Sequence, residues 1–154
     1  MDAERALKQE KVIHLDLQNF SIVESGTSVQ DAVDQMRHER HNCALIQKKG
    51  ELIGIFTERD VLRKVVSDSS TWKKKIDELM TPNPATIAPD DSAEDALEKM
   101  VEGHFRNVPV VDADGQVHGN VTHYAFIKFL AEHFPQQIYN QPPDEGIHED
   151  RYGG

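Results

Sequence analysis

The stretch from Gly54 to Asp60, GIFTERD, combines residue types that can hold a polar ligand. The hydroxyl of Thr57 can donate a hydrogen bond to a phosphate, and the carboxylate of Asp60 can accept hydrogen bonds from two neighbouring ribose hydroxyls. A helix that begins here would also attract an anion to its free N-terminus. The same spacing fits a purely structural helix start, with Thr57 as N-cap and Asp60 complementing the helix dipole. From this string alone the cap is the favoured interpretation.

Other chemistry finds little support in the sequence. His38 and His41 have the spacing of one helical face, but no Cys or carboxylate stands beside them at a recognisable ligand spacing, so we expect no metal site. The pair Asp90 and Asp91 is better explained as the entry to a helix than as acid–base machinery. We find neither a nucleophile paired with a base nor a glycine-rich phosphate loop, and we therefore expect no catalytic residue and no enzyme.

The elements that must position Thr57 and Asp60 belong to an internal repeat. SVQDAVDQM (28–36) matches SAEDALEKM (92–100), and both copies have the apolar spacing of a helix behind a serine cap. Further along, HNCALIQKKGELIGIFTERD (41–60) matches RNVPVVDADGQVHGNVTHYA (106–125), which predicts a β-hairpin and then a second helix in each copy. Extended segments, FSIVES (20–25) and PATIAP (84–89), precede the two copies. Each strand–helix–strand–strand–helix unit spans about 50 residues, so the two units should pack together.

Composition restricts the class of protein and its partners. The 154 residues are 38% hydrophobic, with a formal net charge of −10 that argues against binding to nucleic acid or to an anionic membrane. No apolar run approaches the roughly 20 residues of a membrane span, and MDAERALKQEKV lacks the apolar centre of a signal peptide. The single cysteine, Cys43, excludes an intramolecular disulfide, so we expect a cytoplasmic protein.

These patterns divide the chain into five segments. Residues 1–15 should form an N-terminal amphipathic helix, 16–68 the first repeat, 69–82 a connector and 83–135 the second repeat. The remaining segment, 136–154, is rich in polar and charged residues and is predicted to be a disordered tail.

With this order and duplication, the chain resembles a tandem pair of cystathionine-β-synthase (CBS) domains, the Bateman module. The resemblance covers roughly residues 20–134 and is carried by LIGIFTERD, ELMTPNPATIAPDDSAEDALEKM and FRNVPVVDADGQVHG. It implies an α/β (α+β) fold in which two βαββα repeats pack as a pseudo-twofold pair. In that family, clefts between the repeats bind adenosine-containing ligands (AMP, ADP, ATP, S-adenosylmethionine or NAD), and the proteins are sensors rather than catalysts.

The resemblance also implies which residues form the site. It assigns Thr57 and Asp60 to ribose and phosphate, which reverses the preference for a simple cap. Backbone groups near Met80, Thr81, Ala85 and Thr86 would contact the adenine edge, Val108 and Pro109 would pack on the ring, and Arg106 would bind phosphate. Two alternatives stay open: Arg106 also fits a surface strand residue paired with a carboxylate, and Arg59, a further candidate, also fits a solvated helix face or a dimer contact.

A second, degenerate site is expected in the pseudo-symmetric cleft. Thr122 recurs there, but Ala125 stands where Asp60 would recur, so the ribose acceptor is lost. His41, which matches Arg106, could still help to hold an anion, with Ile22 nearby.

The functional prediction is a non-enzymatic sensor that binds an adenine nucleotide and signals to a separate effector protein. The alternative is a scaffold with an empty cleft whose role is dimerisation or partner docking. We expect a homodimer, because the second helices carry more apolar residues than one pair of repeats can cover: Val61, Leu62, Val65 and Val66 in one copy, and Phe126, Ile127, Phe129 and Leu130 in the other.

Overall fold

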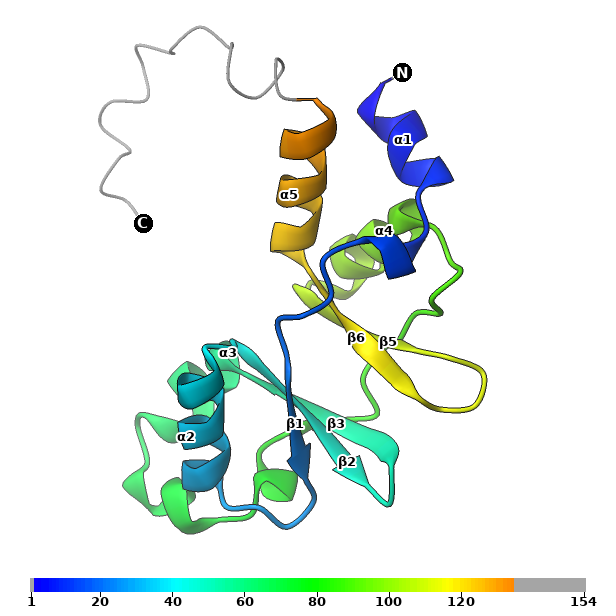
Figure 1. The fold of residues 1–154 in the computed structure, drawn as a ribbon. Coiled ribbons are helices and arrows are strands. Elements are labelled where there is room, and N and C mark those ends of the chain that lie inside the picture. Colours follow the sequence, from blue (N-terminus) through cyan, green and yellow to red (C-terminus); the bar gives the residue numbers. More distant parts are fainter. Residues whose placement is uncertain (1, 135–154) are drawn as a thin grey trace, which may run out of the picture.

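The computed structural model describes residues 2–134, so the predicted tail at 136–154 lies outside the described residues. Two α/β units, one for each sequence repeat, lie side by side (Figure 1). The first contains β1 (Ser21–Glu24), α2 (Val29–Glu39), β2 (Cys43–Lys48), β3 (Glu51–Thr57) and α3 (Glu58–Asp60). The second contains α4 (Ala93–Gly103), β5 (Asn107–Val111), β6 (Val117–Thr122) and α5 (His123–His133). This arrangement confirms the predicted pair of repeats.

The helix starts form as the repeated motif predicts. The Ser28 side chain accepts a hydrogen bond from the backbone N–H of Asp31 at 3.1 Å, and the Ser92 side chain accepts one from Asp95 at 3.1 Å. Each serine thus satisfies one of the free N–H groups at the beginning of α2 or α4. The first hairpin turns at Lys49 and Gly50, both with positive φ, and β2 pairs antiparallel with β3.

The two repeats differ in how their lead-in segments and second helices form. In the first repeat β1 pairs in parallel with β2, whereas the second lead-in, between Pro84 and Pro89, makes only a single parallel bridge from Ile87 to Val110. In the first repeat, the second helix begins with one α-helical turn, α3, and continues as a π-helix, η2 (Val61–Val65). Its counterpart α5 is a regular α-helix.

Each sheet also forms backbone hydrogen bonds with a segment that precedes the other repeat in the sequence. The connector contains η3 (Ser69–Lys73) and η4 (Ile76–Glu78) and ends in β4 (Thr81–Pro82), which pairs with β3 of the first repeat. Correspondingly, the N–H of Asn120 on β6 donates to the carbonyl of Leu17, just ahead of the first repeat, at 3.0 Å. This exchange places the exit of the connector opposite the end of β3, where Thr57 lies.

The predicted N-terminal helix is shorter than residues 1–15 and belongs to the second repeat. It consists of α1 (Ala3–Gln9), followed by a 3₁₀ turn, η1 (Val12–His14). Ala6, Leu7 and Val12 are buried in the same hydrophobic core as α4, β5, β6 and α5. A second core fills the first repeat, and a third, formed by Cys43, Leu45 and Ile55, packs against Val117 of the second repeat.

The apolar surface predicted for dimerisation is only partly available. Val65, Phe126 and Phe129 are buried inside the chain, which corrects their assignment to an exposed face. Leu62, Val66 and Ile127 are 71%, 65% and 56% exposed. None of the helices within residues 2–134 has the length and apolar character that a bilayer span requires.

Candidate ligand-binding site

A cleft of about 910 Å³ lies between the two repeats, within the size range of small-molecule sites. Three structural elements supply the sequence-predicted residues that line it: the start of α3, the exit of the connector, and the facing strand ends of the second repeat. These residues are Thr57, Arg59, Asp60, Thr81, Ala85, Arg106 and Thr122. The fold therefore brings together residues that are far apart in the sequence.

Thr57 and Asp60 form part of a helix cap, as the structural interpretation predicts. One carboxylate oxygen of Asp60, Oδ2, accepts the backbone N–H of Thr57 at 2.9 Å, and the Thr57 hydroxyl lies 3.4 Å from the same oxygen. The Asp60 side chain is only 14% exposed but borders the cleft. A carboxylate has about four lone-pair sites, so this cap leaves acceptor capacity for a ligand.

The other carboxylate oxygen of Asp60 faces Lys64. The ammonium group of Lys64 lies 3.2 Å from Asp60 Oδ1 and donates to the carbonyl of Leu79 at 2.8 Å. The charge of Asp60 also reaches Cys43 behind the cleft: burial raises the pKa of that thiol far above its ordinary value, and the nearby carboxylate raises it further. Cys43 is consequently a neutral core residue rather than a nucleophile.

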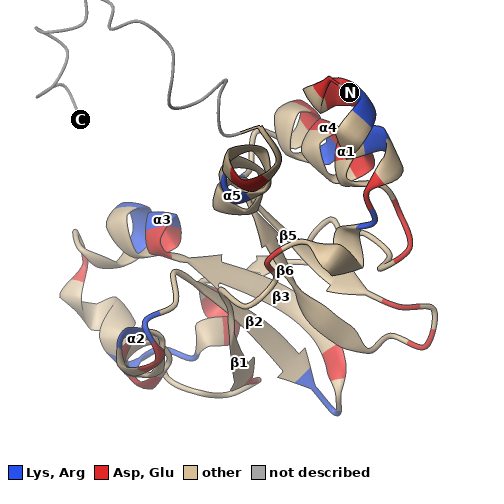
Figure 2. Cartoon of the chain, turned by 45° about the horizontal axis from the view of Figure 1, so that its top comes forward, with Lys and Arg blue, Asp and Glu red and all other residues tan. Residues whose placement is uncertain are grey.

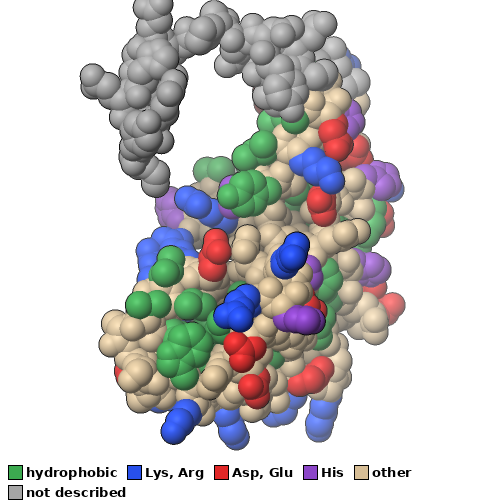
Figure 3. Space-filling model, turned by 60° about the vertical axis from the view of Figure 1, so that its left-hand side comes forward, with side chains coloured by type: hydrophobic (Ala, Val, Ile, Leu, Met, Phe, Trp, Pro, Cys, Tyr) green, Lys and Arg blue, Asp and Glu red, His purple; other side chains and the backbone are tan. Residues whose placement is uncertain are grey.

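Cationic side chains line the same cleft as this acceptor. Arg59, Arg63 and Arg106 line the cleft, and an Arg59 guanidinium nitrogen lies 3.5 Å from the carbonyl of His104. Figure 2 shows basic and acidic residues adjacent to one another at α3, and Figure 3 shows basic and hydrophobic side chains interspersed on one side of the molecule. Guanidinium groups in the same cleft as the carboxylates of Asp60 and Glu58 favour a ligand that carries both an anionic group and hydroxyls.

Sequence reasoning missed an amide network at the back of the cleft. The side-chain nitrogen of Asn120, which is fully buried, donates to the side-chain oxygen of Asn107 at 3.0 Å and to the carbonyl of Asn19 at 3.1 Å. The backbone N–H of Asn42 donates to the Asn19 side chain at 2.9 Å. Asn42 and Asn107 follow His41 and Arg106 in the two repeats, and this duplication was the signal available in the sequence.

Four predicted adenine-contacting residues do not line this cleft. Val108 is completely buried in the core of the second repeat, and Pro109 is buried in the same strand with its carbonyl accepting the N–H of Ile87. Met80 packs against the first core, while Thr86 borders a separate hollow of about 350 Å³. The structure therefore corrects the packing assigned to Val108 and Pro109, because both side chains are buried and have no surface to offer a base.

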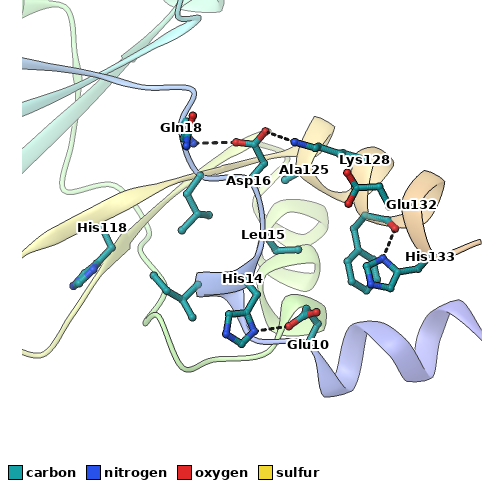
Figure 4. A pocket seen from close by; sticks show the side chains of 13 residues that line it. Glu10, His14, Leu15, Asp16, Gln18, His118, Ala125, Lys128, Glu132 and His133 are labelled. Atoms are coloured by element: carbon teal, nitrogen blue, oxygen red, sulfur yellow. Dashed lines mark hydrogen bonds and ion pairs between the residues drawn. The ribbon is translucent and has the colours of Figure 1, made fainter.

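The expected second site is not assembled in the same way. Thr122 borders the main cleft, but Ile22 packs against the inter-repeat core, and His41 lies 3.0 Å from the Ser21 hydroxyl. Ala125, the counterpart of Asp60, lines a different hollow of about 510 Å³ between α5 and the N-terminal segment (Figure 4). Within residues 2–134 no group of three or more His, Cys, Asp or Glu could hold a metal ion.

Comparisons with known proteins agree with the duplicated fold. Residues 13–67 and 76–132 each match the family model of the CBS domain. The chain is 33% identical over 118 residues to the CBS domain-containing protein CBSCBSPB2 of Arabidopsis thaliana, which covers 75% of this chain and 21% of that protein. It is 31% identical over 107 residues to the arabinose 5-phosphate isomerase KdsD of Francisella tularensis, covering 70% of this chain and 33% of the isomerase. The chain thus spans a fifth to a third of the length of these two relatives.

Among solved structures, the crystal structure of CBSX2 in complex with AMP superposes with a TM-score of 0.67. The two chains are 27% identical, and the match covers 80% of this chain and 97% of CBSX2.

Proposed function

Because this chain belongs to the CBS domain family and carries two such domains, we propose that it is a non-enzymatic regulatory module for an adenine nucleotide. The observation that carries the proposal is the cleft that the Asp60 carboxylate shares with Arg59, Arg63 and Arg106. A nucleotide carries both complementary features, vicinal hydroxyls and phosphate. The similarity to CBSX2, whose structure contains AMP, supports the same ligand class.

The proposed orientation of the ligand follows from the chemistry of the residues that line the cleft. The ribose hydroxyls donate to Asp60, the phosphate accepts from Thr57, Arg59 and Arg106, and the adenine edge meets backbone groups near Thr81 and Ala85. AMP, ADP and ATP fit this charge distribution better than S-adenosylmethionine, whose sulfonium is cationic. NAD would satisfy the same acceptor through one of its riboses.

We further propose that the protein acts as a homodimer and that a separate effector protein responds to the bound ligand. A ligand can shift a conformational equilibrium only by its difference in affinity for the two states. The second copy would pack on an apolar surface of the helices that begin at the cleft. This surface is formed by the exposed side chains of Leu62, Val66 and Ile127. The cytoplasmic location remains a prediction.

One observation favours the alternative of a ligand-free scaffold. Both carboxylate oxygens of Asp60 already have partners inside the protein, Thr57 on one side and Lys64 on the other. A structural role therefore accounts for Asp60 without any ligand.

A thermal-shift and calorimetry series with AMP, ADP, ATP, S-adenosylmethionine and NAD separates the two functions. A ligand at 100 times its dissociation constant should add about 2.7 kcal/mol to the free energy of unfolding. At least one adenine nucleotide should stabilise the sensor. If all five leave the melting temperature unchanged, the scaffold is the correct description.

A further inference from the structure

We propose that Lys64 is a positioning residue that holds the ribose acceptor and the facing wall of the cleft in register. The inference rests on the proposed function, since it concerns how the same cleft selects a ribonucleotide. Lys64 does not line the cleft, and it acts through Asp60 and Leu79.

The contacts of Lys64 restrict the Asp60 carboxylate. Its ammonium group lies 3.2 Å from Oδ1, while Oδ2 accepts the Thr57 N–H at 2.9 Å, so each oxygen is held by a different partner. Rotation of the carboxylate would break both contacts. Each oxygen still has lone-pair capacity for one ribose hydroxyl, and a fixed carboxylate presents these sites without first losing rotational freedom.

The same ammonium group holds the connector. It donates to the carbonyl of Leu79 at 2.8 Å, immediately before the segment that forms the opposite wall. The next residue, Met80, covers Gly54 so closely that a Cβ on this glycine would lie 2.2 Å from its sulfur. Thr81 then pairs with Ile55 in the sheet and lines the cleft. Lys64 therefore links the ribose acceptor to the wall that faces it.

The helix geometry brings Lys64 to both partners. Beyond Asp60 the helix widens into η2, in which the N–H of Val66 donates to the carbonyl of Val61 at 3.0 Å. Lys64 is four residues from Asp60, and its side chain remains 40% exposed. Such π-helical turns occur frequently at functional sites. An exposed lysine has little reason to be fixed for stability alone, because exposed ion pairs contribute little to the stability of the fold.

The second repeat provides a matched control. On α5, the ammonium group of Lys128 lies 3.2 Å from Asp16 Oδ2 on the segment ahead of the first repeat (Figure 4). Each lysine thus joins the second helix of its repeat to the segment that precedes the other repeat. However, Ala125 replaces Asp60 in the second repeat, so the Lys128 contact involves no ribose acceptor.

Calorimetry with AMP and 2′-deoxy-AMP tests the proposal on the full chain, on Lys64→Met, on Lys64→Arg and on Lys128→Met. The parent protein should bind AMP about tenfold more tightly than 2′-deoxy-AMP, which lacks one hydroxyl for Asp60. Lys64→Met should weaken AMP about tenfold and reduce this preference to about twofold, because the carboxylate is no longer held in place. Lys64→Arg should restore most of the preference, and Lys128→Met should leave both affinities unchanged.

The preference for the ribonucleotide separates positioning from general effects. A lost positive charge or a less stable fold would weaken both nucleotides by the same factor, so an unchanged preference in Lys64→Met overturns the proposal. Unchanged affinities for both nucleotides overturn it equally. If the parent protein binds neither nucleotide, the proposed function fails and the role of Lys64 fails with it.

A readout without ligand tests the connector contact separately. Amide hydrogen exchange at residues 79–81 should become severalfold faster in Lys64→Met but not in Lys128→Met, because only Lys64 holds the Leu79 carbonyl. Equal exchange in the two variants would show that Lys64 does not hold the wall.

Discussion

Replacing Asp60 by asparagine separates the two roles of this side chain, helix capping and ligand binding. The amide keeps the shape of the carboxylate and an oxygen that can accept the Thr57 N–H, so the cap contact at 2.9 Å can persist. The amide nitrogen, however, is a donor and cannot accept a ribose hydroxyl. The substitution also removes the ion pair with Lys64.

The two effects differ in size. A ribose hydroxyl left unpaired in the cleft costs about 1–3 kcal/mol, which corresponds to a tenfold to hundredfold loss of affinity for AMP. The i,i+4 ion pair with Lys64, whose side chain is partly exposed, contributes about 0.3–0.5 kcal/mol to folding. For a domain of this size that is a decrease of about 1–2 °C in the melting temperature. Asp60→Asn should therefore lose binding while remaining nearly as stable as the parent.

Calorimetry and thermal unfolding of Asp60→Asn, Asp60→Ala and Thr122→Ala measure both quantities. Asp60→Ala should lose the cap as well, at a cost of about 1 kcal/mol in folding, with a similar loss of AMP affinity. Thr122→Ala should bind AMP nearly like the parent, because Thr122 borders the cleft but the proposed orientation of the ligand assigns no contact to its hydroxyl. If Asp60→Asn and Asp60→Ala bind AMP as tightly as the parent, the carboxylate is a helix cap and not a ribose acceptor.

Three further predictions concern assembly, the buried thiol and acid stability. Light scattering should give twice the 17.4 kDa of one chain, and the double variant Leu62→Asp, Ile127→Asp should be monomeric; a parent protein of single-chain mass at micromolar concentration refutes the dimer. The Cys43 thiol, with its pKa raised by burial, should react with a disulfide reagent only at the rate of unfolding; fast labelling of the folded protein contradicts this. Hydrogen bonds from the Ser25 hydroxyl and the Gly26 N–H lower the pKa of Asp77 below 3.8 in the folded state. The stabilisation of the fold by ionised Asp77 is therefore present above about pH 4 and is lost as the pH falls through the folded-state pKa of this carboxyl. In urea unfolding between pH 2.5 and 6, the free energy of unfolding of Asp77→Asn should depend less on pH than that of the parent. An unchanged pH dependence would exclude this carboxylate as a source of the acid sensitivity.

Local patterns in the sequence predicted most of the fold. The serine caps at Ser28 and Ser92 and the turn at Lys49–Gly50 depend on neighbouring residues, and all form as expected. The duplication then predicted two similar units, because a pattern that occurs twice at the same offsets is unlikely to arise from a chance helix or hairpin. Short-range chemistry was sufficient for these elements.

Long-range backbone pairing could not be predicted in the same way. The contacts of Leu17 with Asn120, and of Thr81 with Ile55, join main-chain groups of segments far apart in the sequence, and main-chain groups leave no residue-type signature. The same limitation explains the error at Val108, since an apolar residue in a short strand has the same pattern whether it faces a ligand or its own core.

The differences between the repeats favour the first one as the proposed ligand site. Both second helices are joined by a lysine to a segment that precedes the other repeat, but the two lysines are not equivalent positions, because the offset of 65 residues aligns Lys64 with Phe129 and Lys128 with Arg63. In the second repeat the partner of Lys128 is the Asp16 carboxylate, and hydrogen bonds from the Gln18 backbone and from Lys128 lower the pKa of that carboxylate. In the first repeat, Lys64 meets the carbonyl of Leu79 in the connector, and its carboxylate partner is Asp60 in the cleft itself. Asp60 both caps the first helix and contacts Lys64, and the proposed ribose contact would be a further role for the same carboxylate, one that the second repeat has lost with Ala125.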